Sequence, residues 1–308
     1  MVNRTLIVIG GPTASGKTRV AAEVARALGT EVVNADARQF YRAMPIGTGQ
    51  PTADELLGVP HHFIGHLEVT QDQSAQEYAH AALPVIDRIL DAHGVAVLTG
   101  GSGLYIDAVC FELDALPPAD KALREKLQQL HREQGLEALQ HELQRLDPAM
   151  WHTIDRNNPH RLIRAIEVCL LTGGKVSELR QGRRPRTGFT PVFLALDVER
   201  NVNYAAIDAR VDAMMRHGLL EEAHALLPHR ERNALQTVGY KELFLHFDGQ
   251  LSLQDAVALI KQHSRNYAKR QMTWLRREAH WRWVRPEEAV SVAVALAGHP
   301  RDSGSRPE

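Results

Sequence analysis

The sequence contains little cysteine and no long apolar run. Its two cysteines, Cys110 and Cys169, lie far apart in the chain, so we expect no disulfide framework and no cysteine-based zinc site. Both are expected to be buried free thiols. No stretch reaches the ~20 uninterrupted apolar residues of a membrane helix, and the first twenty residues lack the basic start, apolar run and cleavage site of a secretory signal. These absences predict a cytoplasmic protein that does not bind membranes.

The charges are distributed unevenly along the chain. The net charge is −1, but residues 1–120 carry 7 Lys/Arg against 14 Asp/Glu, whereas residues 121–308 carry 29 against 23. With 308 residues, 44% of them hydrophobic, the chain can form one large domain or two modest ones. The imbalance fits a catalytic part joined to a part that binds a polyanion, although solvated helix faces also produce it.

Short β-branched runs alternate with helical periodicity up to about residue 112. This order predicts an α/β fold with a P-loop NTPase-like core, in which a parallel sheet carries helices on both faces. The predicted strands are TLIVI (5–9), EVVNAD (31–36) and GVAVLTGG (94–101), and the predicted helices cover about residues 18–28, 74–92 and 103–111.

The middle of the chain shows helical periods and no strand pattern. We therefore predict a mainly α-helical insertion domain at residues 113–189, between core segments 1–112 and 190–300. The second core segment is expected to contain a strand at about 191–197, helices at about 204–226 and 254–277, a short strand in HWRWV and a helix at about 286–297. Residues 301–308 are predicted to be a disordered tail.

The stretch GGPTASGKT, residues 10–18, follows the first predicted strand and precedes a helix. It fits the pattern G-x-x-x-x-G-K-[ST], in which backbone N–H groups and a helix N-terminus surround a polyphosphate. A structural glycine turn is the alternative. The candidate residues for binding a diphosphate or nucleotide here are Gly11, Pro12, Thr13, Ala14, Ser15, Gly16, Lys17 and Thr18.

No acidic residue ends the strand GVAVLTGG, where an ATPase or GTPase normally places an Asp to hold its metal. The acid at a strand end is instead Asp36, a location that small-molecule kinases of this fold use to activate an acceptor. An acceptor must lose a proton as its bond to phosphorus or carbon forms, so we interpret Asp36 as a general base. A cap on the next turn is the alternative interpretation.

A second glycine-rich turn, GGSGLY at residues 100–105, follows the same strand and enters a helix. The carboxyl ends of strands in open α/β sheets line the ligand crevice, so we expect this turn to face the phosphate loop across the site. Ser102 is either a site residue or the N-cap of the helix, and the two roles are compatible.

Two regions concentrate positive charge. Residues 121–187 carry 13 Lys/Arg and 8 Asp/Glu, and residues 261–285 carry 8 Lys/Arg and one acid. On a helix, Lys261, Arg265 and Lys269 form one cationic edge. This ridge favours nucleic acid as a partner, with a solvated face or a small anionic ligand as alternatives. The residues Ile260, Tyr267 and Trp274 follow another face of that helix and are expected to lie in the core.

Seven segments occur in a fixed order: GPTASGKT, NADARQFYRAMPIGTGQP, GGSGLY, NPHRLIRAIEV, RVDAMMRHGLLEEAHAL, TVGYKE and SRNYAKRQMTWLRRE. Together they closely resemble the tRNA dimethylallyltransferase family, also called tRNA isopentenylpyrophosphate transferases. The resemblance spans about residues 5–285. It is to the bacterial type, because the sequence has no counterpart of the C-terminal zinc finger of some eukaryotic relatives.

The resemblance implies transfer of a dimethylallyl group from dimethylallyl diphosphate to the exocyclic amine of the adenosine just 3′ of the tRNA anticodon. The phosphate loop would then hold a leaving group, which agrees with the missing strand-end acid. Lys17, the loop amides and a Mg²⁺ cofactor would stabilise the charge on the departing diphosphate. Thr18 is the candidate metal ligand, and Arg210 in RVDAMM is a further candidate diphosphate contact.

In that chemistry Asp36 accepts a proton from the adenine amine, and Thr99 or Ser102 hydrogen-bonds the bridging oxygen or the amine. The adenine must leave the anticodon-loop stack, and the helical insertion would clasp the anticodon stem of tRNA. We expect a monomer. The candidate tRNA-binding residues are Asp36, Ala37, Arg38, Gln39, Ser102, Arg124, His160, Arg161, Leu162, Ile163, Arg164, Thr237, Val238, Gly239, Tyr240, Lys241, Arg265, Lys269 and Arg270.

Two positions depart from the family pattern. Ala37 follows Asp36 where the family commonly has Ser, which removes a hydroxyl beside the proposed base, and GGSGLY replaces the common GGTGLY, which keeps one.

Two other hypotheses about the function remain open. A small-molecule kinase would need an arginine-bearing lid and an ATP adenine pocket, and a noncatalytic RNA-binding protein would keep its cellular phenotype after Asp36→Ala.

Overall fold

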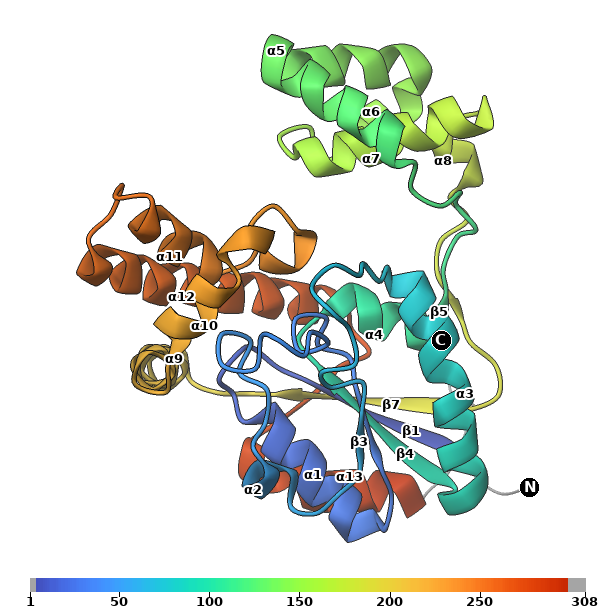
Figure 1. The fold of residues 1–308 in the computed structure, drawn as a ribbon. Helices are drawn as coiled ribbons and strands as arrows, with labels where there is room; N and C mark the ends of the chain where they lie inside the picture. The colour runs from blue at the N-terminus through green and yellow to red at the C-terminus, as the bar shows by residue number, and fades with distance from the viewer. Residues whose placement is uncertain (1–3, 299–308) are drawn as a thin grey trace. The chain divides into compact units, whose positions relative to one another are not determined.

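The structure, a computed structural model, describes residues 4–298 and divides the chain into two units (Figure 1). The first unit contains the residues up to Cys110 and from Arg186 onward, and the second is Phe111–Pro185. The boundaries predicted after residues 112 and 189 lie close to these positions. The predicted tail, residues 301–308, lies outside the described residues.

Within the described residues, the sheet of the first unit has six strands, and all of them pair in parallel. In spatial order they are β3 (His61–His62), β2 (Val32–Asn34), β4 (Val95–Gly100), β1 (Thr5–Gly10), β7 (Thr190–Leu196) and β8 (Arg282–Val284). The register sets Gly10 beside Gly100 and Asn34 beside Thr99. The loops after β1, β2 and β4 therefore leave the same edge of the sheet, where open α/β sheets bind ligands.

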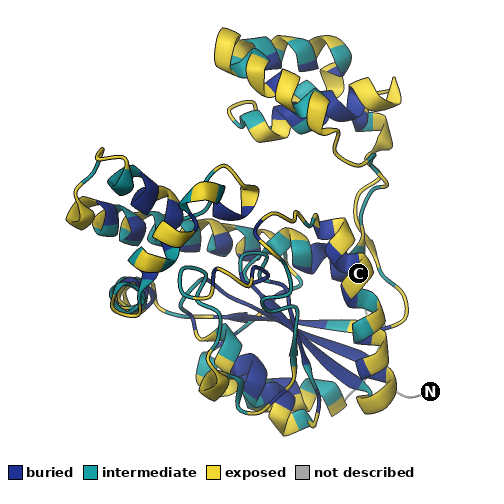
Figure 2. Cartoon of the chain, in the orientation of Figure 1, coloured by how far each residue is buried: buried dark blue, intermediate teal, exposed yellow. Residues whose placement is uncertain are grey.

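Helices cover both faces of this sheet (Figure 1). One face packs against α1 (Lys17–Leu28) and α13 (Ala289–Gly298), and the other carries α3 (Ala75–His93) and α4 (Gly103–Cys110). The fold class predicted from the sequence is confirmed. Figure 2 shows the strands as the most continuously buried segments, as expected for a parallel sheet covered on both sides.

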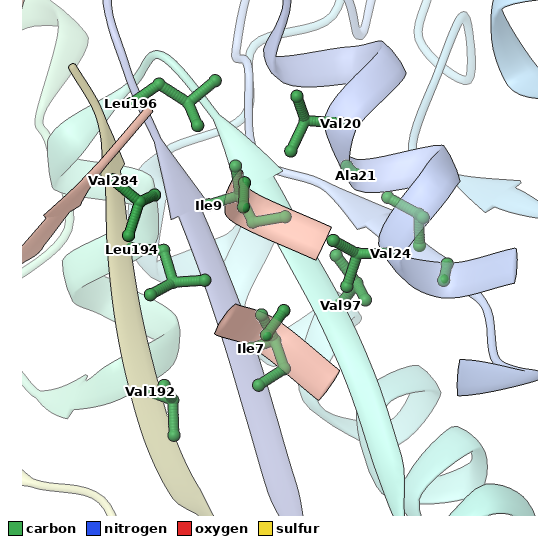
Figure 3. Packing of buried hydrophobic residues seen from close by; sticks show 14 of the residues in the cluster. Ile7, Ile9, Val20, Ala21, Val24, Val97, Val192, Leu194, Leu196 and Val284 are labelled. Atoms are coloured by element: carbon green, nitrogen blue, oxygen red, sulfur yellow. The ribbon is translucent and has the colours of Figure 1, made fainter. Parts of the chain in front are cut away.

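The apolar face of α1 explains its position. Val20, Ala21 and Val24 recur at helical spacing and pack against Ile7 and Ile9 of β1 (Figure 3). Val97 and the apolar residues of β7 extend the same cluster. This packing anchors the start of α1, and with it the loop that precedes the helix, to the end of β1.

A group of helices in the first unit forms a second apolar cluster with the loop that follows β2. These helices are α9 (Arg200–Arg216), α10 (Leu219–Ala225), α11 (Tyr240–Phe247) and α12 (Leu253–Arg277). The prediction of one helix over 204–226 was wrong, because Gly218 takes a left-handed conformation (φ 98°) between α9 and α10. Short elements that were not predicted are β3, α11, α2 (Ala53–Leu56) and two 3-10 turns, η1 (Leu227–His229) and η2 (Asn233–Leu235). The helix predicted at about 286–297 begins with a 3-10 turn, η3 (Pro286–Glu288), and continues as α13.

The second unit is mainly helical, with α5 (Lys121–Leu146), α6 (Pro148–Thr153), α7 (Pro159–Thr172) and α8 (Val176–Leu179). Its core is built from leucines of α5, including Leu139 and Leu143, against Leu162 and Ile166 of α7. A two-stranded antiparallel ribbon that was not predicted, β5 (Phe111–Glu112) with β6 (Arg184–Pro185), joins its two ends. Across residues 4–298, every helix is too short or too polar to span a bilayer.

Candidate active site

The phosphate loop joins the end of β1 to the start of α1 and folds tightly on itself. Lys17 Nζ donates a hydrogen bond to the carbonyl oxygen of Pro12 at 2.8 Å, and the N–H of Ser15 donates to the same oxygen at 3.3 Å. Ala14 has a φ of 60°, which helps the chain to turn. The loop therefore surrounds the N-terminus of a helix, a position that favours anions.

A small cavity of about 100 Å³ lies between this loop and the loops that follow β2 and β4. Three cationic side chains, Lys17, Arg19 and Arg210, line it together with the carboxylates of Asp36 and Glu55. Its other lining residues are Thr13, Ala14, Gly16, Thr18, Asn34, Gln39, Thr48, Gly49, Pro51, Thr99 and Gly100. The cavity thus combines cations, hydroxyls and loop backbone, as phosphate sites do.

Lys17 and Arg210 dominate the electrostatics of this small cavity. Burial lowers the pKa of Lys17 from 10.5 to about 8, while the charge of Asp36 opposes the shift and that of Arg210 adds to it. Burial also lowers the pKa of Arg210. Its Nη2 donates to the carbonyl oxygen of Gly49 at 2.9 Å. Within residues 4–298 neither cation forms an ion pair, so a bound anion would stabilise both.

Asp36 lies just beyond the end of β2 and is held by its own neighbours. Its N–H donates to Asn34 Oδ1, and its Oδ1 accepts from the N–H of Arg38, both at 3.2 Å. Asn34 is itself fixed because its Nδ2 donates to the carbonyl oxygen of Phe63 at 3.0 Å. The carboxylate of Asp36 therefore has a defined position, with one oxygen partly engaged by the backbone.

A larger cavity of about 610 Å³ also borders Asp36. It shares Thr13, Asp36, Thr48 and Arg210 with the small cavity, so the two meet at these residues. Its remaining lining residues are Arg38, Gly47, Ile207, Val211, Met214, Leu219, Gln236, Thr237, Val238, Gly239, Lys241, Glu242, Leu245, Leu259, Ile260, His263, Ser264, Asn266, Tyr267 and Arg270. An anion site and a larger, partly apolar space thus adjoin one carboxylate, as an acceptor and a donor with an anionic leaving group require.

The two candidate hydroxyls differ in their partners. Thr99 lines the small cavity and donates through Oγ1 to the carbonyl oxygen of Ile9 at 3.2 Å. Ser102 Oγ instead accepts from the N–H of Ala37 at 3.0 Å. Ser102 therefore ties the Asp36 turn to α4. Its predicted contact with the reacting groups stays a prediction.

Tyr267 was expected to lie in the core, but its side chain lines the larger cavity. Burial raises its pKa well above the usual value, and the nearby charge of Asp36 raises it further. Its hydroxyl is thus a donor at neutral pH. The guanidinium of Arg270 lies over its ring, 5.6 Å from the centroid.

The structure gathers several predicted tRNA-binding residues of the first unit around the larger cavity. Arg38, Lys241 and Arg270 supply positive charge there, together with the predicted residues Thr237, Val238 and Gly239. Gln39 lies in the small cavity and donates through Nε2 to the carbonyl oxygen of Gly49 at 2.8 Å. Tyr240 is fully buried and donates to Glu222 Oε1 at 2.6 Å, so its side chain supports the fold.

The cationic edge of α12 is partly neutralised. Lys261 pairs with Asp212 at 2.6 Å, and Arg265 pairs with Asp208, both acids being on α9. Lys269 is exposed and forms no ion pair within the described range 4–298. The sequence pattern correctly placed these cations on one edge of the helix, but it did not reveal the acids opposite two of them.

The predicted residues of the second unit have different surroundings. Leu162 and Ile163 lie in its apolar core, so their side chains are not accessible to a ligand. Arg124 and Arg164 both bind the buried carboxylate of Glu167, at 2.9 Å and 2.6 Å. The exposed members of the predicted set are His160 and Arg161.

Several residues that build the site were not predicted from the sequence. Thr48 and Glu55 line the small cavity, and the signal for Thr48 was the glycine-threonine run GTGQP. Gln271 and Asn203 are buried polar residues that hydrogen-bond the phosphate loop from α12 and α9. No spacing rule would have found these two, because their partners are backbone groups far away in the chain.

Known proteins similar to this chain identify its family. A family model described as IPP transferase matches residues 39–278, more than half of the chain. The chain belongs to the tRNA dimethylallyltransferase family. It is 44% identical over 283 residues to the tRNA dimethylallyltransferase of Christiangramia forsetii, covering 92% of this chain and 94% of the relative. It is 41% identical over 292 residues to tRNA dimethylallyltransferase 1 of Bacteroides thetaiotaomicron, covering 95% of each.

Solved structures of tRNA dimethylallyltransferases share the fold. The full-length tRNA isopentenylpyrophosphate transferase of Bacillus halodurans aligns over 96% of both chains with a TM-score of 0.70 and 35% identity. A eukaryotic dimethylallyltransferase studied while acting on tRNA aligns over 89% of this chain and 70% of that one, with a TM-score of 0.73 and 25% identity. The resemblance inferred from the seven segments is confirmed, and the chain is a prenyltransferase by family.

Proposed function

We propose that this chain transfers a dimethylallyl group from dimethylallyl diphosphate to the exocyclic amine of the adenosine 3′-adjacent to the tRNA anticodon. The products are isopentenyladenosine and diphosphate. Family membership supports the reaction class, and one structural observation carries the residue assignment: Asp36 lies where the small cationic cavity meets the larger one. A base at that junction can act on an acceptor while the leaving group departs on the other side.

The small cavity is assigned to the diphosphate of the donor. The bond that breaks joins the allylic carbon to oxygen, so negative charge accumulates on the diphosphate as it leaves. Lys17, Arg210 and the N-terminus of α1 line that cavity. Because the charge on the diphosphate grows as the bond breaks, these groups would stabilise the transition state more than the ground state.

Magnesium fits this arrangement. Within residues 4–298 no cluster of three or more His, Cys, Asp or Glu side chains could hold a metal alone, so the protein would supply few ligands. The hydroxyl of Thr18 lines the small cavity and is a hard oxygen donor. Mg²⁺ is commonly held by one or two protein oxygens, waters and phosphate oxygens, so Thr18 would hold it together with the diphosphate. When bound, the ion would stabilise negative charge on the leaving group.

Asp36 is assigned as the base for the adenine amine. This amine is a poor nucleophile because its lone pair is delocalised into the ring. As nitrogen bonds to the allylic carbon it becomes cationic and acidic, and the carboxylate then accepts its proton. Ala37 lacks the hydroxyl that the family commonly has at this position, but its N–H donates to Ser102 Oγ at 3.0 Å and holds the turn beside the base.

The larger cavity is assigned to the adenine and the neighbouring anticodon-loop nucleotides. An adenine enters it only after leaving the stack, and this costs a few kcal/mol that backbone contacts must offset. Arg38, Lys241 and Arg270 lie at this cavity and can contact phosphates, and Tyr267 offers an aromatic ring. Exposed cations of the second unit, such as Arg161, are assigned to the anticodon stem.

The test is transfer of label from dimethylallyl diphosphate, labelled in its allyl carbons, to unmodified tRNA with Mg²⁺ and without ATP. Wild type is compared with Asp36→Asn, and Asp54→Asn on the exposed surface of α2 serves as the matched control. We expect Asp36→Asn to lower kcat by about 10²-fold or more, with a much smaller change in donor KM. Equal losses in both constants would contradict base catalysis, and ATP consumption with a small acceptor but no labelling would indicate a kinase.

A further inference from the structure

Two buried side-chain amides from other elements form hydrogen bonds with the backbone of the phosphate loop. Gln271 on α12 is 6% exposed and Asn203 on α9 is 4% exposed, and both bond the backbone of Thr13. We propose that Gln271 and Asn203 are positioning residues that set the distance between the diphosphate site and the Asp36 base. This inference rests on the proposed function.

Gln271 bridges the two glycine-rich loops. Its Oε1 accepts from the N–H of Thr13 at 2.8 Å, and its Nε2 donates to the carbonyl oxygen of Gly101 at 2.9 Å. A backbone N–H can only donate and a carbonyl oxygen can only accept, so the two partners fix the orientation of the amide. One side chain therefore links the loop after β1 to the loop after β4.

Asn203 holds the same residue from the opposite backbone group. Its Nδ2 donates to the carbonyl oxygen of Thr13 at 3.0 Å. Both polar backbone groups of Thr13 are thus engaged by side chains, and its N–H is already donated within the protein. The diphosphate must therefore rely on other loop amides and on Lys17, while Thr13 acts as the fixed point of the loop.

The contact of Gln271 with the second loop requires glycine. A Cβ atom at Gly101 would lie 2.3 Å from Gln271 Nε2 and 3.2 Å from Asp36 Oδ2. The bridge therefore ends at a glycine beside the proposed base, where even a Cβ atom would crowd both Gln271 and Asp36. A change in the length or tilt of this bridge would alter the gap between Thr13, which lines both cavities, and Asp36.

Loss of these hydrogen bonds should disturb the alignment of the reacting groups more than the affinity for diphosphate. Lys17, Arg210 and the start of α1 do not depend on the bridge for their charge, so diphosphate should still bind without it. The in-line approach of amine, allylic carbon and leaving oxygen does depend on the spacing of the two loops. A displacement of about 1 Å at a reacting centre can cost 10²-fold in rate.

The test compares Gln271→Met and Asn203→Leu, which keep side-chain volume and remove the hydrogen bonds, with Gln254→Met, an exposed position on α12. Three quantities are measured for the full-length chain: kcat and donor KM, the Kd of inorganic diphosphate, and hydrogen exchange of the peptide covering residues 10–16. We expect kcat to fall about 10-fold to 100-fold and loop exchange to accelerate, with the diphosphate Kd changed by less than about 3-fold. The control should change none of them.

Unchanged kcat with a lower melting temperature would overturn the proposal, since it would show that the amides only stabilise the fold. An equal loss in kcat and diphosphate affinity would also overturn it, because the amides would then shape the binding site itself. If wild type transfers no label to tRNA, the proposed function fails, and loop exchange with diphosphate binding then decides whether the bridge exists.

Discussion

Arg210 of the first unit and the pair Arg124 and Arg164 of the second unit are used in opposite ways. In the second unit, Arg124 and Arg164 are both bound to one carboxylate, Glu167, which is fully buried. In the first unit, Arg210 is partly buried near Lys17, and it donates a hydrogen bond to the carbonyl oxygen of Gly49. An arginine whose charge is already paired holds a fold together, whereas one left with only a carbonyl partner is prepared for an anion. Sequence motifs alone do not distinguish these two cases.

The largest effect that can test this comparison is expected at Arg210. Arg210→Met keeps the stem of the side chain and removes the charge, so kcat/KM for the donor should fall by about 10²-fold to 10³-fold. The free energy of unfolding should change little, because no ion pair is broken. Arg216→Met, at the exposed end of α9, is the matched control. Steady-state kinetics and urea unfolding measure both quantities, and a stability loss without a rate loss would reverse the assignment.

The second effect is expected at Glu167, where a substitution should lower stability and leave the transfer rate nearly unchanged. Glu167→Gln leaves two arginines facing a neutral amide, and we expect unfolding to become easier by about 2 kcal/mol, below the usual cost of a broken buried pair because both arginines are partly exposed. The transfer rate of the folded enzyme should stay within about 3-fold of wild type. Glu137→Gln, an exposed position on α5, is the control.

The pH dependence of folding stability provides another test of the role of Glu167. Burial alone would raise the pKa of Glu167, but hydrogen bonds from Arg124 and Arg164 lower it below 4.5. A carboxyl whose pKa is lower in the folded chain stabilises it above pH 4.5, and that contribution disappears as the pH falls through the folded-state pKa. The stability difference between wild type and Glu167→Gln should therefore shrink below pH 4.5. A constant difference down to pH 3 would contradict the role of this carboxylate.

A smaller effect is expected from Lys17. Its pKa of about 8 means that roughly half of the free enzyme carries a neutral lysine at pH 8 and about a tenth does so at pH 7. A diphosphate stabilises the charged form and raises this pKa, so binding should take up about half a proton at pH 8 and much less at pH 7. Titration calorimetry in buffers of different ionisation enthalpy measures the uptake. Lys17→Arg, which stays charged, corrects for protons exchanged by the ligand.

The smallest effect is expected on the edge of α12. Lys269 is exposed, whereas Lys261 is bound to Asp212 at 2.6 Å. If Lys269 contacts a tRNA phosphate, Lys269→Ala should lower the slope of log affinity against log salt by about 1, and Lys261→Ala should lower it by less. Filter binding over a range of salt concentrations provides the slopes. Equal changes for both variants would show that the pairing with Asp212 does not hold in the complex.

Much of the core was predictable because its signals are local. The phosphate loop lies between a buried strand and a helix, and the apolar period of α1 specifies which side of that helix meets β1. Asp36 was found from its place at a strand end, and parallel pairing brings all such ends to one edge. The break between α9 and α10 was missed because a single glycine does not by itself end a helical pattern, and the left-handed conformation of Gly218 is seen only in the structure.

The sequence by itself determined the α/β core, the phosphate loop, the placement of Asp36 beside it and membership in the tRNA dimethylallyltransferase family. These follow from short stretches whose spacing is set by helix and strand geometry. Only the tertiary structure decided which cations are paired, that Tyr267 faces a cavity, and that Gln271 and Asn203 hold Thr13. The physical reason is that ion pairs, cavities and buried hydrogen bonds depend on distances between residues far apart in the chain, and these distances exist only once the elements have packed together.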